Sequence, residues 1–289
     1  MKLFDPSLPF FKGNTHAHTT NSDGRVTPDE CMRQYKEAGY DFLALTDHWY
    51  VGEKKQYQGM LVLPGVEYDF TFPAQVLHLV ALYPDAKLAD GISRGMDHRE
   101  VIAHVNRAGG VAIAAHPAWS LNTTEFLCSL EGVDIAEVYN TMSGEPFNGP
   151  RADSETLLDV AAANGKLFNL AAADDSHLYQ GEQCVSYVMV QAAELTVPAV
   201  LDALRKGCFY SSQGPVFRNI EIAGNEVVIE TSPVRRITVC SNRVWVGGRC
   251  MEGEGLTRRV YQIQPNEKYI RIQLTDENGR RAWSNPIRI

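Results

Sequence analysis

The sequence lacks several features that would place it in a broad class at once. None of its apolar runs approaches the roughly 20 residues that a membrane-spanning helix requires. The N-terminal stretch has no apolar centre and no small-residue cleavage site, which argues against a removable secretory leader. The net charge of −8 argues against a general nucleic-acid-binding protein, which would normally show a basic face. These absences predict no membrane partner and no stable nucleic-acid binding.

Cysteine is present but dispersed. The six cysteines form no CxxC pair and show no tight spacing. A disulfide framework or a cysteine-ligated zinc site would need closer or more regular spacing. A reducing cytoplasm is therefore the predicted location, and the sequence carries no indication of the oligomeric state.

Residues 13–213 alternate between short apolar runs and helical patterns. The segment 27–39 is a predicted helix, with Thr27 as its cap, Pro28 at its first position and Gly39 as its stop. Polar residues collect where the apolar runs end, as in 41–48, which finishes in Thr-Asp-His. This alternation is typical of a βα-barrel, whose chemistry lies at the C-terminal ends of the strands. About seven strands can be counted, so we predict a distorted barrel.

The pattern changes after Gly214-Pro215. The stretches FRNIEI, EVVIET, RRITVCS, RVWVGG, RRVYQIQ and YIRIQLTD are short, alternating and rich in β-formers. Asp-Glu-Asn-Gly at 276–279 predicts a hairpin turn. We therefore expect an α/β barrel over residues 1–215, followed by a small antiparallel β-sandwich domain over residues 216–289. The short join predicts that the two parts pack firmly.

Nine ionisable residues lie within or at the ends of the predicted strands, and six of the chain's eight histidines are among them. The nine are His16, His18, Asp23, His48, Glu67, His78, His116, Asp175 and His177. In His16-x-His18 the two imidazoles project to the same side of an extended segment, where one cation can hold both. Imidazole and carboxylate without thiolate favour Zn²⁺, Mn²⁺ or Fe²⁺. Nine ligands exceed the needs of one ion, so two or three divalent ions are expected.

Five motifs carry a family resemblance. In order, HAHTTNSDG, LALTDHW, GVEY, AAHP and DDSH resemble those of the PHP (polymerase and histidinol phosphatase) superfamily of metal-dependent phosphoesterases, over about residues 13–213. The resemblance implies a distorted (β/α)7 barrel. The β-rich C-terminal part is similar to the appendage that a subset of PHP proteins carries after the catalytic domain.

The resemblance also implies a distribution of ligands among metal ions. One ion would be held by His16, His18, Glu67 and Asp175, with Glu67 bridging to a second ion on His78 and His116. A third would lie between Asp23, His48 and His177. An Asp at position 23, where some relatives have His, favours the branch that acts on small phosphoesters. Asp174 departs from the usual pattern, and either supports a ligand histidine or caps the turn.

The predicted function is that of a metal-dependent phosphoesterase. It would hydrolyse a small phosphate mono- or diester by attack of a metal-bridging hydroxide. The residues expected to be catalytic are Glu67, Asp175, His177 and His48. Either His177 or His48 would protonate the leaving group if the third site is empty, and a metal-bound water would do so if it is filled. The residues predicted to hold the substrate phosphate, from two loops at the mouth of the site, are Lys54, Lys55 and Arg151.

Two alternatives stay open. A hydrolase of carboxylic or carbamate esters would use the same metals, and the side chains expected at its more apolar mouth are Trp49, Tyr50, Trp119 and Phe147. A non-catalytic module would use its metals structurally or bind a partner. Degenerate PHP domains of that kind lose ligands, whereas all nine are present here.

Overall fold

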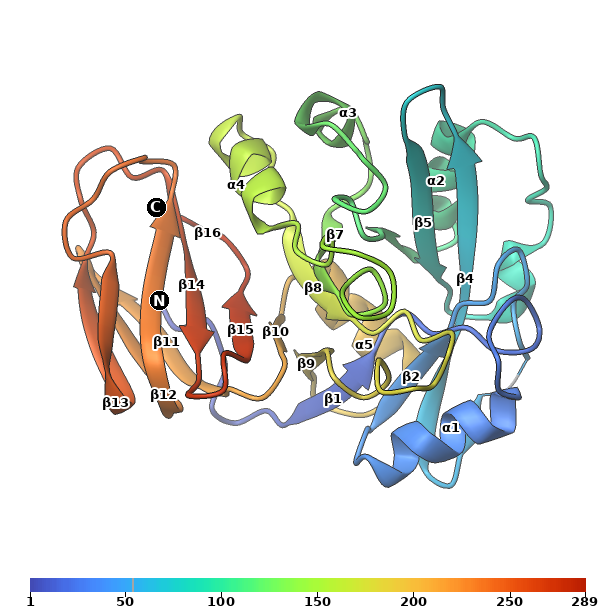
Figure 1. Cartoon of the computed structure of the whole chain (residues 1–289), viewed down its shortest axis with the longest axis horizontal. Coiled ribbons are helices and arrows are strands. Elements are labelled where there is room, and N and C mark those ends of the chain that lie inside the picture. The colour runs from blue at the N-terminus through green and yellow to red at the C-terminus, as the bar shows by residue number, and fades with distance from the viewer. Residues whose placement is uncertain (54) are drawn as a thin grey trace.

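The computed structural model describes residues 1–53 and 55–289, which form a mixed α/β structure with one large sheet and few helices (Figure 1). The elements up to residue 212 are β1 (Phe10–Asn14), α1 (Pro28–Glu37), β2 (Phe42–Leu45), β3 (Gln56–Tyr57), β4 (Met60–Thr71), β5 (Val76–Leu82), η1 (Ala86–Ala89), α2 (His98–Arg107), β6 (Val111–Ala114), α3 (Thr124–Cys128), β7 (Ile135–Asn140), α4 (Glu155–Ala163), β8 (Asn169–Ala173), β9 (Tyr187–Gln191), α5 (Val197–Arg205) and β10 (Phe209–Ser212). Those beyond it are β11 (Phe217–Ala223), β12 (Glu226–Ser241), β13 (Cys250–Gln262), β14 (Tyr269–Thr275), β15 (Arg281–Ser284) and β16 (Ile287–Arg288). Among the described helices, none is long and apolar enough to cross a bilayer.

Local signals place the first helix as predicted. The Thr27 side chain accepts a hydrogen bond from the Glu30 amide, which satisfies one of the free donors at the start of α1. Pro28 occupies the first turn, where no amide is needed. Met32 and Tyr35 face the interior and are fully buried. Capping and an apolar stripe therefore decide this element without long-range help.

The strands are not all related by crossover helices. β1, β2 and β4 pair in parallel, and so do β6, β7 and β8. Between these groups β5 is antiparallel to both β4 and β6, because a short turn returns the chain from β4 directly into β5. The alternation of strand and helix is thus interrupted at this hairpin.

The two ends of this strand series meet beside the loops that follow β1 and β8. Ala17 and Ser176 form a parallel bridge, and the His18 amide donates to the Ser176 carbonyl oxygen over 2.9 Å. The Asp175 amide donates to the carbonyl oxygen of His16 over 3.0 Å. This pairing brings the first and the last of the predicted motifs into direct contact.

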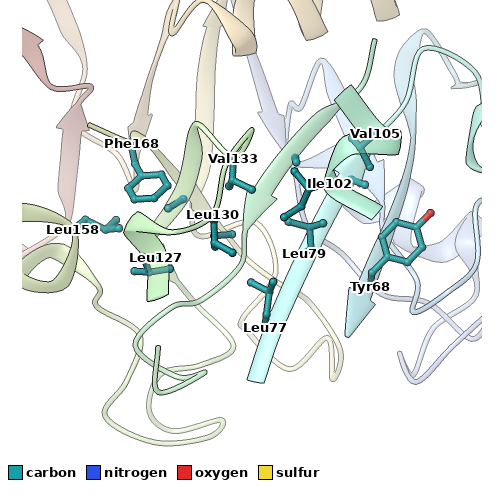
Figure 2. Close-up of a cluster of buried hydrophobic side chains, with 14 of the residues drawn as sticks. Tyr68, Leu77, Leu79, Ile102, Val105, Leu127, Leu130, Val133, Leu158 and Phe168 are labelled. Carbon is teal, nitrogen blue, oxygen red and sulfur yellow. The ribbon is translucent and has the colours of Figure 1, made fainter. Parts of the chain in front are cut away.

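The outer faces of the strands pack on the helices, which leaves the polar residues on the other face. Leu77 and Leu79 of β5 enter the apolar cluster drawn in Figure 2, together with Ile102 of α2 and Tyr68 of β4. Successive side chains of a strand point to opposite faces. The alternation therefore turns His78, and likewise Glu67 in β4, away from this core.

After residue 216 the strands pair antiparallel throughout, as predicted, and the sheet continues into β10 through β15 (Figure 1). The hairpin turn at 276–279 joins β14 to β15. Two predictions were wrong in detail. EVVIET and RRITVCS belong to one strand, β12, and RVWVGG (243–248) is a loop rather than a strand. In that loop the side chain of Trp245 is 82% exposed, because no neighbouring strand covers it.

The C-terminal strands pack firmly on the rest of the chain. The buried guanidinium of Arg271 in β14 donates to both carboxylate oxygens of Asp159 in α4, over 2.7 and 2.6 Å, and to Glu155 over 3.0 Å. Trp283 of β15 is fully buried in the same core as β7, and its ring lies 5.9 Å from that of Tyr139. A firm contact between the two parts is what the short join predicted.

Candidate metal centre

The HxH motif after β1 supplies the centre of the site. His16 and His18 are fully buried, and their Nε2 atoms face each other over 3.1 Å. Glu67 Oε2 lies 3.3 Å from His16 Nε2 and 3.1 Å from His18 Nε2. Asp175 Oδ1 lies 3.1 and 3.2 Å from the same two nitrogens. Two imidazole nitrogens and two carboxylate oxygens from distant segments thus converge on one point.

This convergence fits a divalent cation. Asp175 Oδ1 is buried without a hydrogen-bond partner, which is costly for a carboxylate oxygen unless something else satisfies it. Two nitrogens and two anionic oxygens are a suitable ligand set for Zn²⁺, Mn²⁺ or Fe²⁺. The buried cluster is therefore able to hold a metal ion.

Glu67 faces two groups of histidines with its two oxygens. Its Oε1 lies 2.9 Å from His78 Nδ1 and 3.3 Å from His116 Nε2. Its Oε2, which faces the first pair of histidines, also lies 3.4 Å from His48 Nε2. A carboxylate placed this way is able to bridge two ions, the role that the family resemblance implies for Glu67.

Asp23 gathers a third group at the exposed side of the site. Its carboxylate oxygens lie 3.3 Å from His18 Nδ1, 3.5 Å from His177 Nε2 and 3.7 Å from His48 Nε2. A neutral imidazole has one lone pair, so His18 can ligate through only one of its nitrogens. If Nε2 serves the first group, Nδ1–H donates to Asp23, which leaves Asp23, His48 and His177 as the third set.

Electrostatics couple these groups strongly. Burial lowers the pKa of His16, but the carboxylates of Asp175, Glu67 and Glu137 outweigh burial and hold that pKa well above its usual value. His18 has a raised pKa on the same balance. The pKa of Glu67 is held well below its usual range by the histidines around it, against the effect of burial. Without metal, the cluster thus retains protons that a cation would displace.

Sequence reasoning missed Glu137 in the middle of β7. This buried carboxylate accepts from His16 Nδ1 over 2.8 Å, from the His116 amide over 2.8 Å and from Asn140 Nδ2 over 2.7 Å. It thus fixes which nitrogen of His16 carries the proton and leaves Nε2 free to ligate. Its signal was a lone acidic residue inside an otherwise apolar buried strand, which requires a partner.

Asp174 caps the turn that follows β8. Its carboxylate accepts from the amides of Cys184, Val185 and Ser186 over 2.7, 3.0 and 2.7 Å, and Tyr35 Oη donates to it over 2.8 Å. Burial raises the pKa of Asp174 to about 7, although these hydrogen bonds oppose the rise. Of the two roles considered for Asp174, the contacts are those of a turn cap.

A cavity of about 280 Å³ opens onto the ligand groups. Its lining residues are Asp23, His48, Glu67, His78, His116, Trp119, Met142, Ser143, Asn148, Asp175 and His177. All four residues predicted to be catalytic are among them. Of the aromatic residues proposed for an apolar mouth, only Trp119 belongs to this lining.

The two described candidates for holding the substrate phosphate do not belong to this lining. Lys54 lies outside the described residues. Lys55 pairs instead with Asp85, with 3.1 Å between Nζ and Oδ2. Arg151 is exposed and is not among the residues that line the cavity. Their role in binding substrate stays a prediction.

No protein-family model and no curated protein matches the chain. Among solved structures, it is similar to a two-domain protein from Bacteroides vulgatus described as containing a predicted PHP-like metal-dependent phosphoesterase. The TM-score is 0.56 at 15% identity, over 99% of this chain and 96% of that one. A proposed metal-dependent phosphoesterase from Bifidobacterium adolescentis has a TM-score of 0.44 at 18% identity. That match covers 67% of this chain and 94% of the other. An amidohydrolase from Chromobacterium violaceum has a TM-score of 0.41 at 16% identity, and that match covers 59% of this chain and 89% of the other.

The first of these likenesses spans both parts of the chain. The chain thus shares the fold of a two-domain, PHP-like protein, and the resemblance predicted from the five motifs is confirmed at the level of the fold.

Proposed function

We propose that this chain is a metal-dependent hydrolase that cleaves small phosphate mono- or diesters. The observation that carries the proposal is Glu67, whose two oxygens face separate groups of histidines inside a cavity open to ligands. A shared carboxylate of this kind is what a site with two adjacent ions requires. The fold likeness to a protein described as containing a PHP-like phosphoesterase supports phosphate esters as the substrates.

The proposed arrangement assigns each ligand to an ion. The first set is His16, His18, Glu67 and Asp175; the second is Glu67, His78 and His116; the third is Asp23, His48 and His177. Zinc, manganese or iron in these sets would supply a strong nucleophile from water near neutral pH and neutralise charge on the ester oxygens. The proposal includes a distorted (β/α)7 barrel over residues 1–215 and a β-sandwich over 216–289.

His177 is the better placed of the two proton donors considered. Its Nδ1–H donates to the carbonyl oxygen of Asp175 over 2.7 Å, which orients the ring and leaves Nε2 facing Asp23 and the cavity. The Nδ1 atom of His48 is buried without a hydrogen-bond partner, so its ring is held less firmly. With no ion in the third set, a proton on His177 Nε2 could be delivered to a leaving alkoxide in the cavity; an ion bound there would take up that nitrogen instead.

Hydrolysis of carboxylic or carbamate esters is the second candidate. The apolar share of the lining, Trp119 and Met142, favours it. A matched panel of phosphate monoesters, phosphate diesters and aryl carboxylic esters separates the two candidates, with the metal-loaded protein as catalyst. Faster turnover of the carboxylic esters than of either phosphate class would reject the phosphoesterase assignment.

Glu67 provides the direct test of the shared site. Glu67→Ala and Asp175→Ala are expected to abolish turnover, whereas Glu252→Ala, on exposed β13, should retain it. Metal content is measured on each variant by elemental analysis. If Glu67→Ala kept near wild-type rates with metal present, the two-ion scheme would be wrong. A wild-type protein that bound metal but hydrolysed no ester would instead support a non-catalytic module.

A further inference from the structure

The cavity lining contains a part that the candidate ligands do not use. Trp119 follows β6, and Met142, Ser143 and Asn148 follow β7. The Trp119 ring lies 4.8 Å from the His116 ring and 5.6 Å from the His78 ring, at steep angles to both. The indole therefore borders the side of the site where the second ion is proposed.

This part of the lining is uncharged, and the rest consists of carboxylates and histidines. The described lining residues include the carboxylates of Asp23, Glu67 and Asp175 but no lysine or arginine. Arg94, a nearby cation, is engaged elsewhere, with its guanidinium 4.8 Å from the Trp49 ring centre and 3.8 Å from Asp69 Oδ2. Bound divalent ions can balance the charge of one reacting phosphate group. A second anionic group on the substrate would meet three carboxylates and no lysine or arginine among the described lining residues.

The volume of the cavity also restricts the size of the substrate that it can enclose. About 280 Å³ is near the lower end for small-molecule sites, and a cavity of roughly 150 Å³ suffices for benzene. One ring together with a phosphate group therefore fills the space, and a nucleotide with its sugar and base exceeds it.

Resting on the proposed function, we infer that Trp119 and Met142 form the subsite for the leaving alcohol, and that the substrate is a phosphate ester of an uncharged, flat, single-ring alcohol. An indole and a thioether both make favourable contacts with an aromatic ring. Asn148 and Ser143 offer hydrogen bonds to a polar substituent on that ring. In the reaction, the oxygen of water bonds to phosphorus, and the bond between phosphorus and the ester oxygen of the alcohol breaks. The proton lost by water ends on the oxygen of the released alcohol.

The subsite is held in place by the structure around it. The loop that carries Met142 is closed at its base by a bridge between Tyr139 and Asp153, and the Asn140 amide donates to the Ala152 carbonyl oxygen over 2.9 Å. Arg281 of β15 pairs with Asp153, and its guanidinium lies 5.1 Å from the Tyr139 ring centre. A wall fixed in this way selects by shape instead of adapting to each ligand.

Binding of non-hydrolysable analogues tests the subsite apart from catalysis. Phenylphosphonate, 4-carboxyphenylphosphonate and cyclohexylphosphonate are titrated into the metal-loaded protein by calorimetry. We expect phenylphosphonate to bind at least tenfold more tightly than the carboxylated analogue. Trp119→Leu should weaken phenylphosphonate 5- to 20-fold and cyclohexylphosphonate less than threefold. Trp245→Leu, in an exposed loop of the C-terminal part, is the matched control and should change neither.

Kinetics with the corresponding phosphate esters provide the second measurement. Trp119→Leu should raise KM for phenyl phosphate 5- to 20-fold with kcat changed less than threefold, at unchanged metal content. Tighter binding of the carboxylated phosphonate, or equal effects of Trp119→Leu on the phenyl and cyclohexyl compounds, would overturn the inference. Selective phosphonate binding without release of phosphate from any ester would uphold the subsite and reject the proposed function.

Discussion

Glu137 should control metal affinity although it belongs to none of the proposed ligand sets. Its Oε1 accepts from His16 Nδ1 over 2.8 Å, and its Oε2 accepts from the His116 amide and from Asn140 Nδ2. In Glu137→Gln one oxygen becomes an NH₂ group of similar size, so packing is preserved while one acceptor becomes a donor. The variant must therefore place a donor against donors on one of its two sides.

Neither orientation of the new amide preserves the site. If NH₂ takes the place of Oε2, it faces the His116 amide, which cannot rotate away or accept a hydrogen bond. If it takes the place of Oε1, His16 Nδ1 has to become the acceptor, and the proton moves to Nε2. That tautomer has no lone pair directed at the cation, so His16 is lost as a ligand.

The expected loss follows from the role of such supporting carboxylates. Their removal typically lowers metal affinity 10- to 100-fold, which corresponds to about 1.4–2.7 kcal/mol. Affinity is measured by competition with a chromophoric chelator at fixed pH. Glu252→Gln, on the exposed strand β13, is the matched control and should bind metal as the wild type does. A Glu137→Gln affinity within twofold of wild type would refute the tautomer argument.

Three further outcomes are expected. Arg271→Met should lower the free energy of unfolding in urea by about 2–4 kcal/mol, because it leaves the carboxylate of Asp159 beside an uncharged side chain; a loss below 1 kcal/mol would mean that the pair contributes little. Gly13→Ala should cost about 1–3 kcal/mol in the same assay, since its Cβ would fall 2.1 Å from the buried Phe42 ring. Metal affinity should decrease as pH falls, because a cation must displace protons from His16, whose pKa is raised. Calorimetry in buffers of different ionisation enthalpy measures the protons released on metal binding. Metal binding without proton release would contradict the raised pKa.

The parts of the fold that local chemistry determines could be predicted from the sequence. Thr27 and Pro28 mark the start of α1 because a cap and a missing amide act within one helical turn. Eight of the nine candidate ligands also fall in the groups that the structure brings together, and His116 lies 3.3 Å from Glu67, because the polar ends of neighbouring strands meet in one place. His18 was assigned to one set, yet it also contacts Asp23, and only the positions of the ring nitrogens show this.

Features that depend on distant partners could not be predicted in this way. RVWVGG alternates like a strand, but strand propensity depends on neighbouring strands, and Val244 in this stretch is 99% exposed. Glu137 lies within β7, and its partner His16 is 121 positions earlier in the chain. Its importance follows only from that long-range contact.

The C-terminal strands contribute to the site without lining it. The described lining ends at His177, so none of the residues after 216 reaches the cavity directly. Arg281 pairs with Asp153 at the base of the loop that carries Met142, and Trp283 lies against Tyr139, the residue before Asn140 at the end of β7. Loss of these contacts would free the loop while leaving the ligand groups intact. The two parts of the chain are thus divided by their sequence pattern but joined through the cavity wall that Met142 forms.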